Sequence, residues 1–157
     1  MKFFTLNRAF YSLIVLLLAI QLYRPEPNIG NAYSDQDIFH YTTVPDNVKE
    51  ILTTSCFDCH SNNTHYPWYS VVQPIGLWLQ HHVDEGKDEL NFTEFKTYTS
   101  KRQKHKMEEI VEMVREGEMP LKSYALIHGD TRLSEAQKKV LITWAESMYN
   151  GIQLNDE

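Results

Sequence analysis

The chain has 157 residues, which is enough for one folded domain with or without a short extra segment and excludes multi-domain assemblies and long repeat arrays. Hydrophobic residues make up 42% of it and charged residues 23%, so collagen-like and disordered compositions are excluded as well. The net charge of -6 argues against a nucleic-acid-binding surface, and two cysteines are too few for a disulfide-based scaffold.

The first expected element is an export segment over residues 1–23. Lys2 and Arg8 precede a nearly unbroken apolar run from Phe10 to Leu22, a pattern typical of a signal sequence or a membrane anchor. The run is short for a bilayer, yet no small-x-small cleavage site follows it at the usual distance, which favours an uncleaved anchor. The positive charges predict a cytoplasmic amino terminus. The rest of the chain is therefore expected on the periplasmic side of the inner membrane, or free in the periplasm if the segment is cleaved.

Residues 24–34 are expected to form an extended linker. Pro25, Pro27 and Gly30 occur there without helical or strand periodicity. The folded domain is therefore predicted to cover residues 35–151.

Helices are the recurring pattern within this domain, and strand-type alternation is almost absent. The first helix is expected after Pro45, with Asp46 as its N-cap. The last helix opens with a capping-box pattern at Ser134 and Gln137. These patterns predict an all-α fold. The expected helices cover residues 46–54, 74–82, 100–117 and 134–151.

Both cysteines lie in one stretch, Cys56-Phe57-Asp58-Cys59-His60. CxxCH is the attachment signature of c-type haem, in which each thiol forms a thioether with a haem vinyl group and the adjacent histidine ligates the iron. Thiols three residues apart on a helical turn project from the same side, which suits attachment to one porphyrin. The motif therefore predicts one covalent haem c, held by Cys56 and Cys59, with His60 as an iron ligand.

Two other chemistries use the same cysteine spacing. A redox-active disulfide would need the pair after a strand in a βαβ unit, and no such pattern precedes Cys56. A zinc site would need further ligands from scattered histidines such as His65 or His81, because the chain has no second CxxC pair. Both stay as alternatives with less support than haem.

Several segments of the domain follow one known pattern: Cys56 to Thr64, Tyr66 to Tyr69, Pro74, Trp78-Leu79, His82-Val83, Glu85-Gly86, Leu90-Asn91-Phe92 and Gly117 to Leu121. They resemble the bacterial haem-binding domain family of small membrane-anchored c-type cytochromes. The resemblance extends from about Val44 to Met148, and Ile20-Gln21 and Arg24-Pro25 are similar to the end of the family's apolar amino terminus. It implies a monohaem c-type domain in the periplasm, in a respiratory or peroxide-linked chain. The family name by itself implies no reaction.

The sixth iron ligand is the main open choice. Met119 is favoured because it lies on a constrained loop, between a helix-ending glycine and a proline, where a thioether can be held against iron. His128, in an expected loop, is its main rival. His105 lies in the charged segment 101–106, which is expected to be a solvated helix face. The remaining candidates are His65, His81 and His82.

The sequence as a whole predicts a cytochrome c-like helical domain around one haem. Its expected function is one-electron transfer, with periplasmic or membrane redox proteins as partners and no nucleic acid. A peroxidase-like enzyme or a haem-based sensor is the alternative. Both would need an open sixth position, and the enzyme would also need an acid or base such as His128 or Glu118. The aromatic residues that would either line the haem or fill the core are Tyr66, Trp68, Tyr69 and Trp78.

Overall fold

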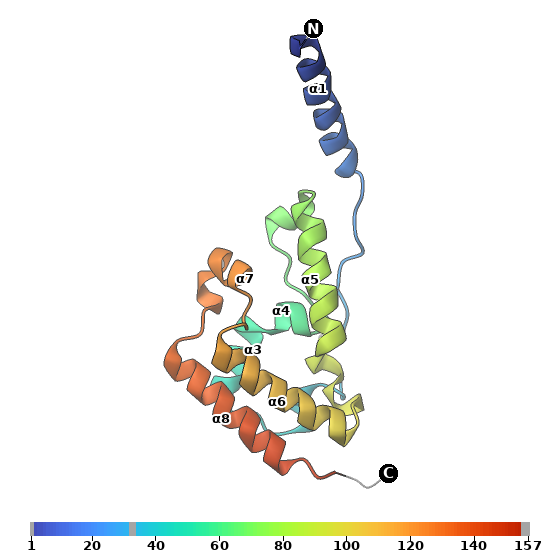
Figure 1. The fold of residues 1–157 in the computed structure, drawn as a ribbon. Helices are drawn as coiled ribbons and strands as arrows, with labels where there is room; N and C mark the ends of the chain where they lie inside the picture. Colours follow the sequence, from blue (N-terminus) through green and yellow to red (C-terminus); the bar gives the residue numbers. More distant parts are fainter. Residues whose placement is uncertain (1, 32–33, 155–157) are drawn as a thin grey trace.

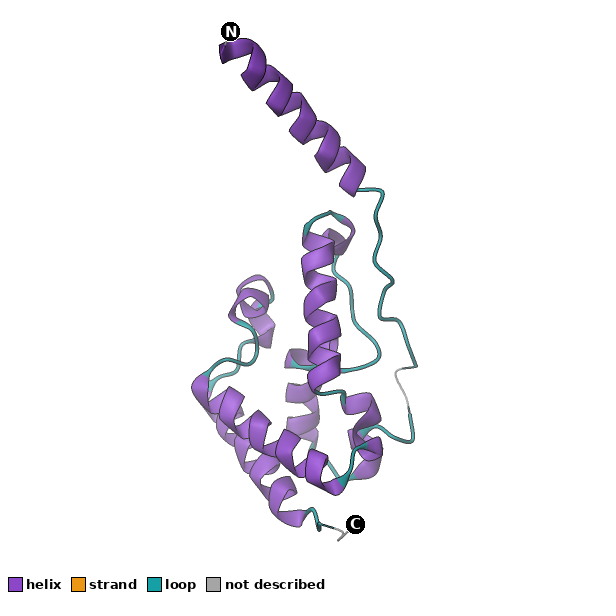
Figure 2. Ribbon diagram, turned by 45° about the vertical axis from the view of Figure 1, so that its right-hand side comes forward, coloured by secondary structure: helices purple, strands orange, loops and turns teal. Residues whose placement is uncertain are grey.

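The structure, a computed structural model, describes residues 2–31 and 34–154 (Figure 1). The described part consists of helices and loops, with no strand and one isolated bridge between Ile29 and Asn63 (Figure 2). The predicted all-α fold is therefore confirmed. The elements are α1 (Lys2–Ile20), α2 (Ile38–Tyr41), α3 (Asp46–Ser55), α4 (Phe57–His60), η1 (Trp68–Val71), α5 (Ile75–Glu89), η2 (Phe92–Thr97), α6 (Ser100–Glu116), α7 (Lys122–Ile127), η3 (Gly129–Thr131) and α8 (Glu135–Gly151).

α1 extends away from the other helices (Figure 1). Its large apolar side chains between Phe10 and Leu18 are exposed. The chain just after α1 is attached to the domain through Gln21, whose Nε2 donates to the Gln73 carbonyl at 2.9 Å and whose Oε1 accepts from the Gln73 amide at 3.0 Å. Across the described ranges, every helix falls short of the length or the apolar character that crossing a membrane requires.

The extended segment after α1 runs along the domain instead of standing free of it. The side-chain amide of Asn28 donates to the Ser61 carbonyl at 2.9 Å and to Thr64 Oγ1 at 2.8 Å. These bonds attach the segment to the loop that follows the cysteine motif. The boundaries predicted for the linker, residues 24–34, stay a prediction, and residues 32 and 33 lie outside the described residues.

The four helices expected from the sequence are present as α3, α5, α6 and α8. α8 begins with the predicted capping box, in which Ser134 and Gln137 bond reciprocally. α6 ends at the predicted Gly117, whose φ of 71° lies in the left-handed region that favours glycine. The N-cap predicted for α3 is wrong. Pro45 occupies that position because its carbonyl accepts the first helical bonds, and Asp46 is the first helical residue.

α5 runs to Glu89, well beyond the predicted end near His82. Apart from Val83, the added turns consist of charged residues and Gly86, so apolar periodicity does not continue there. Tertiary contacts hold these turns instead: Val83 is buried, and Gly86 packs against the backbone of Cys59.

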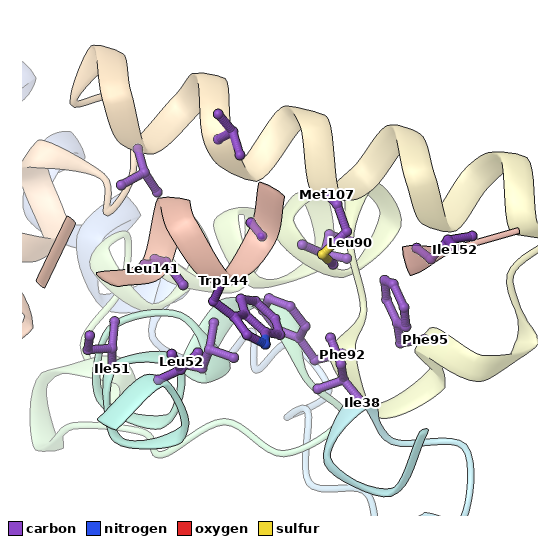
Figure 3. Packing of buried hydrophobic residues seen from close by; sticks show 14 residues of the cluster. Ile38, Ile51, Leu52, Leu90, Phe92, Phe95, Met107, Leu141, Trp144 and Ile152 are labelled. Atoms are coloured by element: carbon purple, nitrogen blue, oxygen red, sulfur yellow. The ribbon is translucent and has the colours of Figure 1, made fainter. Parts of the chain in front are cut away.

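The core lies between α3, α6, α8 and η2 (Figure 3). α6 packs along α8, and the two helices contribute Met107, Leu141 and Trp144 to the core. Phe92 and Phe95 of η2 are almost completely buried beside them. Burial of these apolar side chains holds α3, and with it the cysteine motif, against the α6 and α8 pair.

The capping box of α8 gives a test of how far local signals stabilise this fold. Ser134→Ala removes the hydroxyl that accepts from the Gln137 amide at 3.3 Å. We expect the free energy of unfolding to fall by about 1 kcal/mol, the usual cost of losing an N-cap side chain. A denaturant titration measures this change. An unaltered midpoint would show that the capping box does not contribute.

Candidate functional site

The cysteine motif lies at the junction of α3 and α4. Cys56 has non-helical backbone angles (φ -128°, ψ -39°), and α4 then forms one turn that ends at His60. Phe57 stacks between Phe39 and Phe92, at centroid distances of 5.0 and 5.2 Å. This aromatic stack fixes the turn that carries the motif against the core.

Both cysteines are free thiols, and both line one cavity. Burial raises the pKa of Cys56 to about 12, and the neighbouring Cys59 adds to the shift. Burial, together with the charge of Asp58, raises the pKa of Cys59 to about 11. Redox-active CxxC pairs depend on a thiol whose pKa is lowered. The environment of these thiols therefore disfavours the disulfide alternative.

His60 is held in one orientation by the backbone. Its Nδ1 lies 3.0 Å from the Leu90 carbonyl oxygen, which can only accept, so Nδ1 carries the proton and Nε2 keeps its lone pair. Burial lowers the pKa of His60, and backbone hydrogen bonds to Leu90 and Gly86 offset only part of this effect. A neutral imidazole with a free Nε2 is the form that ligates a metal.

α5 covers one side of the motif through a close contact at Gly86. A Cβ atom at this position would lie 2.7 Å from the Cys59 carbonyl oxygen and 3.1 Å from Cys59 Cβ. Both neighbours belong to the motif turn itself, which has little freedom to move. Glycine is therefore the residue that lets α5 approach α4 this closely.

Two adjoining cavities meet at the motif, and the four residues predicted from the sequence come together there. Cys56, His60 and Met119 line both cavities, and Cys59 lines the first. The first has a volume of about 440 Å³ and the second about 270 Å³. Apolar side chains that line the second cavity include Leu52, Leu90, Phe92, Ile110 and Leu141.

These residues fit a covalently bound haem. Two thiols, a neutral imidazole and a thioether are the donor set of a c-type site, and the apolar wall suits the porphyrin faces. Their roles as attachment points and iron ligands stay predictions, which spectroscopy can test.

Met119 is positioned by the end of α6. The Glu118 and Met119 amides both donate to the Met113 carbonyl oxygen, at 2.9 and 3.2 Å, directly after the Gly117 helix end. This fixes the loop on its amino-terminal side. Met113 itself also lines the second cavity, and helical periodicity alone does not distinguish it from a core methionine.

The rival histidines are differently placed. His128 Nε2 lies 2.6 Å from Tyr69 Oη, and His128 lines an adjoining cavity of only about 40 Å³. His82 does line the first cavity, together with His60. The candidates with exposed side chains are His65, His81 and His105.

The charged segment 101–106 is not the uniformly solvated face that the sequence predicts. Gln103 and Lys106 are buried on the inner side of α6. Lys106 Nζ pairs with Glu109 at 2.6 Å and with Glu89 at 3.2 Å. Charge composition did not reveal this, because the turn geometry of the helix directs these two side chains inward. Lys106 and Glu89 thus place charges at the wall of the second cavity.

The aromatic cluster from the sequence borders the site without entering the two main cavities. Trp68 is 81% exposed. Tyr66 accepts from the Asn28 amide and donates to Gln80 Oε1, both at 2.7 Å. Tyr69 and Trp78 line the small cavity next to His128.

Tyr124 is a site residue that the sequence reasoning missed. It lies on α7, lines the first cavity and donates to Asp58 Oδ2 at 2.6 Å. Burial, with the adjacent Asp58 carboxylate, raises the pKa of Tyr124, so the phenol remains a donor. No local pattern joins Asp58 to a tyrosine so far along the chain.

Comparison with known proteins adds one match. A family model described as a haem-binding domain matches residues 15–147, which is most of the chain. No curated protein and no solved structure matches. The described residues contain no group of three or more histidine, cysteine, aspartate or glutamate side chains arranged to hold a metal ion.

Proposed function

We propose, since the chain belongs to the haem-binding domain family, that it is a monohaem c-type cytochrome that carries single electrons. The observation that supports this most directly is the convergence of Cys56, Cys59, His60 and Met119 on one pair of cavities. The four residues come from two separate parts of the fold: the motif turn of residues 56–60 and the loop after α6. Together they make a complete donor set for one covalently held haem.

Each residue has a defined role in this proposal. Cys56 and Cys59 would form the two thioether bonds, which fix the cofactor to α4. His60 would ligate the iron through Nε2, oriented by its bond to the Leu90 carbonyl. Met119 would supply the sixth ligand. A haem c with histidine and methionine ligands takes up and releases one electron, at a higher potential than with two histidines.

The walls of the site support electron transfer more than bond-making chemistry. The second cavity offers mostly apolar side chains to the cofactor position, with Glu89, Lys106 and Glu109 as its charged lining residues. Among the described residues, neither His128 nor Glu118 lines either of the two main cavities. Glu118 instead forms an ion pair with Lys122 at 3.2 Å, and His128 is hydrogen-bonded to Tyr69.

A spectroscopic experiment tests the proposal. The protein is produced with a haem c maturation system and denatured, and haem that stays on the chain is measured. Retention in the native sequence and its loss in the Cys56→Ser/Cys59→Ser variant are the expected results. The native ferric protein should be six-coordinate and low-spin, with the near-infrared band of sulfur-to-iron charge transfer. Absence of covalent haem would refute the proposal.

A peroxidase-like enzyme or a haem-based sensor is the second candidate. One observation favours it: α7, which follows Met119, has no buried residue, so burial contributes little to holding this side of the loop in place. A high-spin ferric spectrum, or rapid binding of added ligands by the native protein, would support this candidate over the electron carrier.

Export to the periplasm is a further part of the proposal. The exposed apolar side chains of α1 and the basic residues Lys2 and Arg8 support a role for residues 1–23 as a signal or membrane anchor. The partners would be periplasmic or membrane redox proteins. Fractionation of cells that express the full chain, with protease treatment of spheroplasts, tests this location. Recovery in the cytoplasm would contradict it.

A further inference from the structure

The loop that carries Met119 is held very differently at its two ends. On the α6 side, two backbone amides donate to the Met113 carbonyl, so that side is tied to a long helix in the core. On the other side the chain enters α7, a short helix with no buried residue. Leu126 and Ile127 of α7 are 74% and 57% exposed. Apolar burial therefore does little to fix the second end of the loop.

Side-chain hydrogen bonds hold α7 in place, among them one from Arg132 Nε to the Ala125 carbonyl oxygen at 2.7 Å. Tyr124 Oη donates to Asp58 Oδ2 at 2.6 Å, which joins α7 directly to the turn between the two cysteines. His128 directly follows α7, and its Nε2 lies 2.6 Å from Tyr69 Oη. α7 otherwise projects away from the α6 and α8 pair (Figures 1 and 2). The Tyr124–Asp58 bond links the Met119 side of the site directly to the turn between Cys56 and Cys59.

We propose that the Tyr124–Asp58 hydrogen bond is a latch that keeps the Met119 loop closed over the haem position. The inference rests on the proposed function, because it takes Met119 as the sixth ligand. Tyr124 is a positioning residue here: it acts on iron ligation only through the loop. With the latch closed, Met119 would be held at the iron of a bound haem. With it open, Met119 would be free to leave, and small molecules could bind in its place.

The bond is well suited to this role. A hydrogen bond to a carboxylate is stronger than one between neutral groups. Asp58 is held on its own side, since its Oδ1 accepts from the His65 amide at 3.1 Å and its carbonyl accepts from Thr64 Oγ1. The acceptor is thus fixed to the motif, and movement of α7 has to break the bond.

The test compares Tyr124→Phe with the native haem protein. This variant removes the hydroxyl and keeps the aromatic ring, which lies 4.6 Å from the His128 ring. We expect a weaker sulfur-to-iron band and about tenfold tighter binding of imidazole to the ferric protein, in line with the loss of a hydrogen bond to a charged group. Hydrogen exchange of the amides in residues 122–127 should also become faster.

Tyr41→Phe is the matched control. Tyr41 also donates a phenol hydrogen bond, to the amide oxygen Oε1 of Gln103 at 3.0 Å, but it lines neither main cavity. We expect this variant to leave the band and the imidazole affinity unchanged. Asp58→Asn replaces the charged acceptor with a neutral amide and should weaken the band as well, and combining it with Tyr124→Phe should add little, because both changes act on the same bond.

The possible failures are distinguishable. If the native protein shows the band and Tyr124→Phe keeps it with native imidazole affinity and native amide exchange, the latch is refuted and the proposed function stands. If the native protein has covalent haem without the band, Met119 is not the ligand, and both the sixth-ligand assignment and the latch are overturned. An equal effect of Tyr41→Phe would show that any lost phenol bond loosens the site, which also refutes the latch.

Discussion

Replacing Met119 with alanine is expected to abolish the sulfur-to-iron charge-transfer band and to lower the reduction potential. Met119 is the thioether that lines both cavities beside His60 from a loop with a fixed first half. Its loss would leave water or a nearby histidine as the sixth ligand. Axial ligands set haem potentials over a range of roughly 0.8 V, so we expect a fall on the order of 0.1 V or more. Near-infrared absorption and a redox titration measure the two effects.

Met107→Ala is the matched control for this prediction. Met107 is fully buried in the core, and neither main cavity includes it among its lining residues. Its truncation should cost about 2–5 kcal/mol of stability and leave the band in place. A native band in Met119→Ala would remove Met119 from the site. His82, which already lines the first cavity, would then be the next residue to replace.

Replacing Gly86 with alanine is expected to damage both stability and haem attachment. The new Cβ would lie 2.7 Å from the Cys59 carbonyl oxygen, closer than such atoms can approach, so α5 and α4 would have to separate. Overpacking of this kind costs about 1–3 kcal/mol or more. The shift would also move the Leu90 carbonyl that orients His60, because Leu90 directly follows α5. Thermal unfolding and the yield of covalent haem measure the two consequences.

Gly151→Ala serves as the comparison, since a Cβ at Gly151 meets no atom within 4 Å. We expect this variant to keep native stability within about 0.5 kcal/mol, as for ordinary surface substitutions. Should Gly86→Ala match the native protein in melting temperature and haem yield, α5 would not be a rigid support of the motif.

The two predictions examine opposite sides of one site. Gly86 acts where the attachment turn meets α5, and Met119 acts where the α6–α7 loop faces the same cavities. Loss of haem in the first variant and altered ligation with haem retained in the second would separate attachment from ligation. The proposed latch at Tyr124 connects these two sides, so its variant should resemble a mild form of the Met119 variant.

The sequence by itself determined the features that depend on residues close together in the chain. The CxxCH spacing defines a possible haem attachment site within one helical turn, and the Ser134 capping box and the Gly117 stop mark helix ends through bonds spanning a few residues. Helical periodicity was sufficient for the all-α class. These features can be predicted from the sequence because local hydrogen bonds and backbone preferences do not depend on the rest of the fold.

Only the tertiary structure decided which distant residues meet. It brings Met119 to the cavities that His60 also lines. It also forms the hydrogen bonds between His128 and Tyr69 and between Tyr124 and Asp58. It buries Lys106 within a segment whose composition predicts solvent exposure, and it extends α5 to Glu89, past the predicted end near His82. These outcomes follow from the packing of helices against each other. Packing depends on the shapes and burial of side chains from the whole chain, which no local pattern contains.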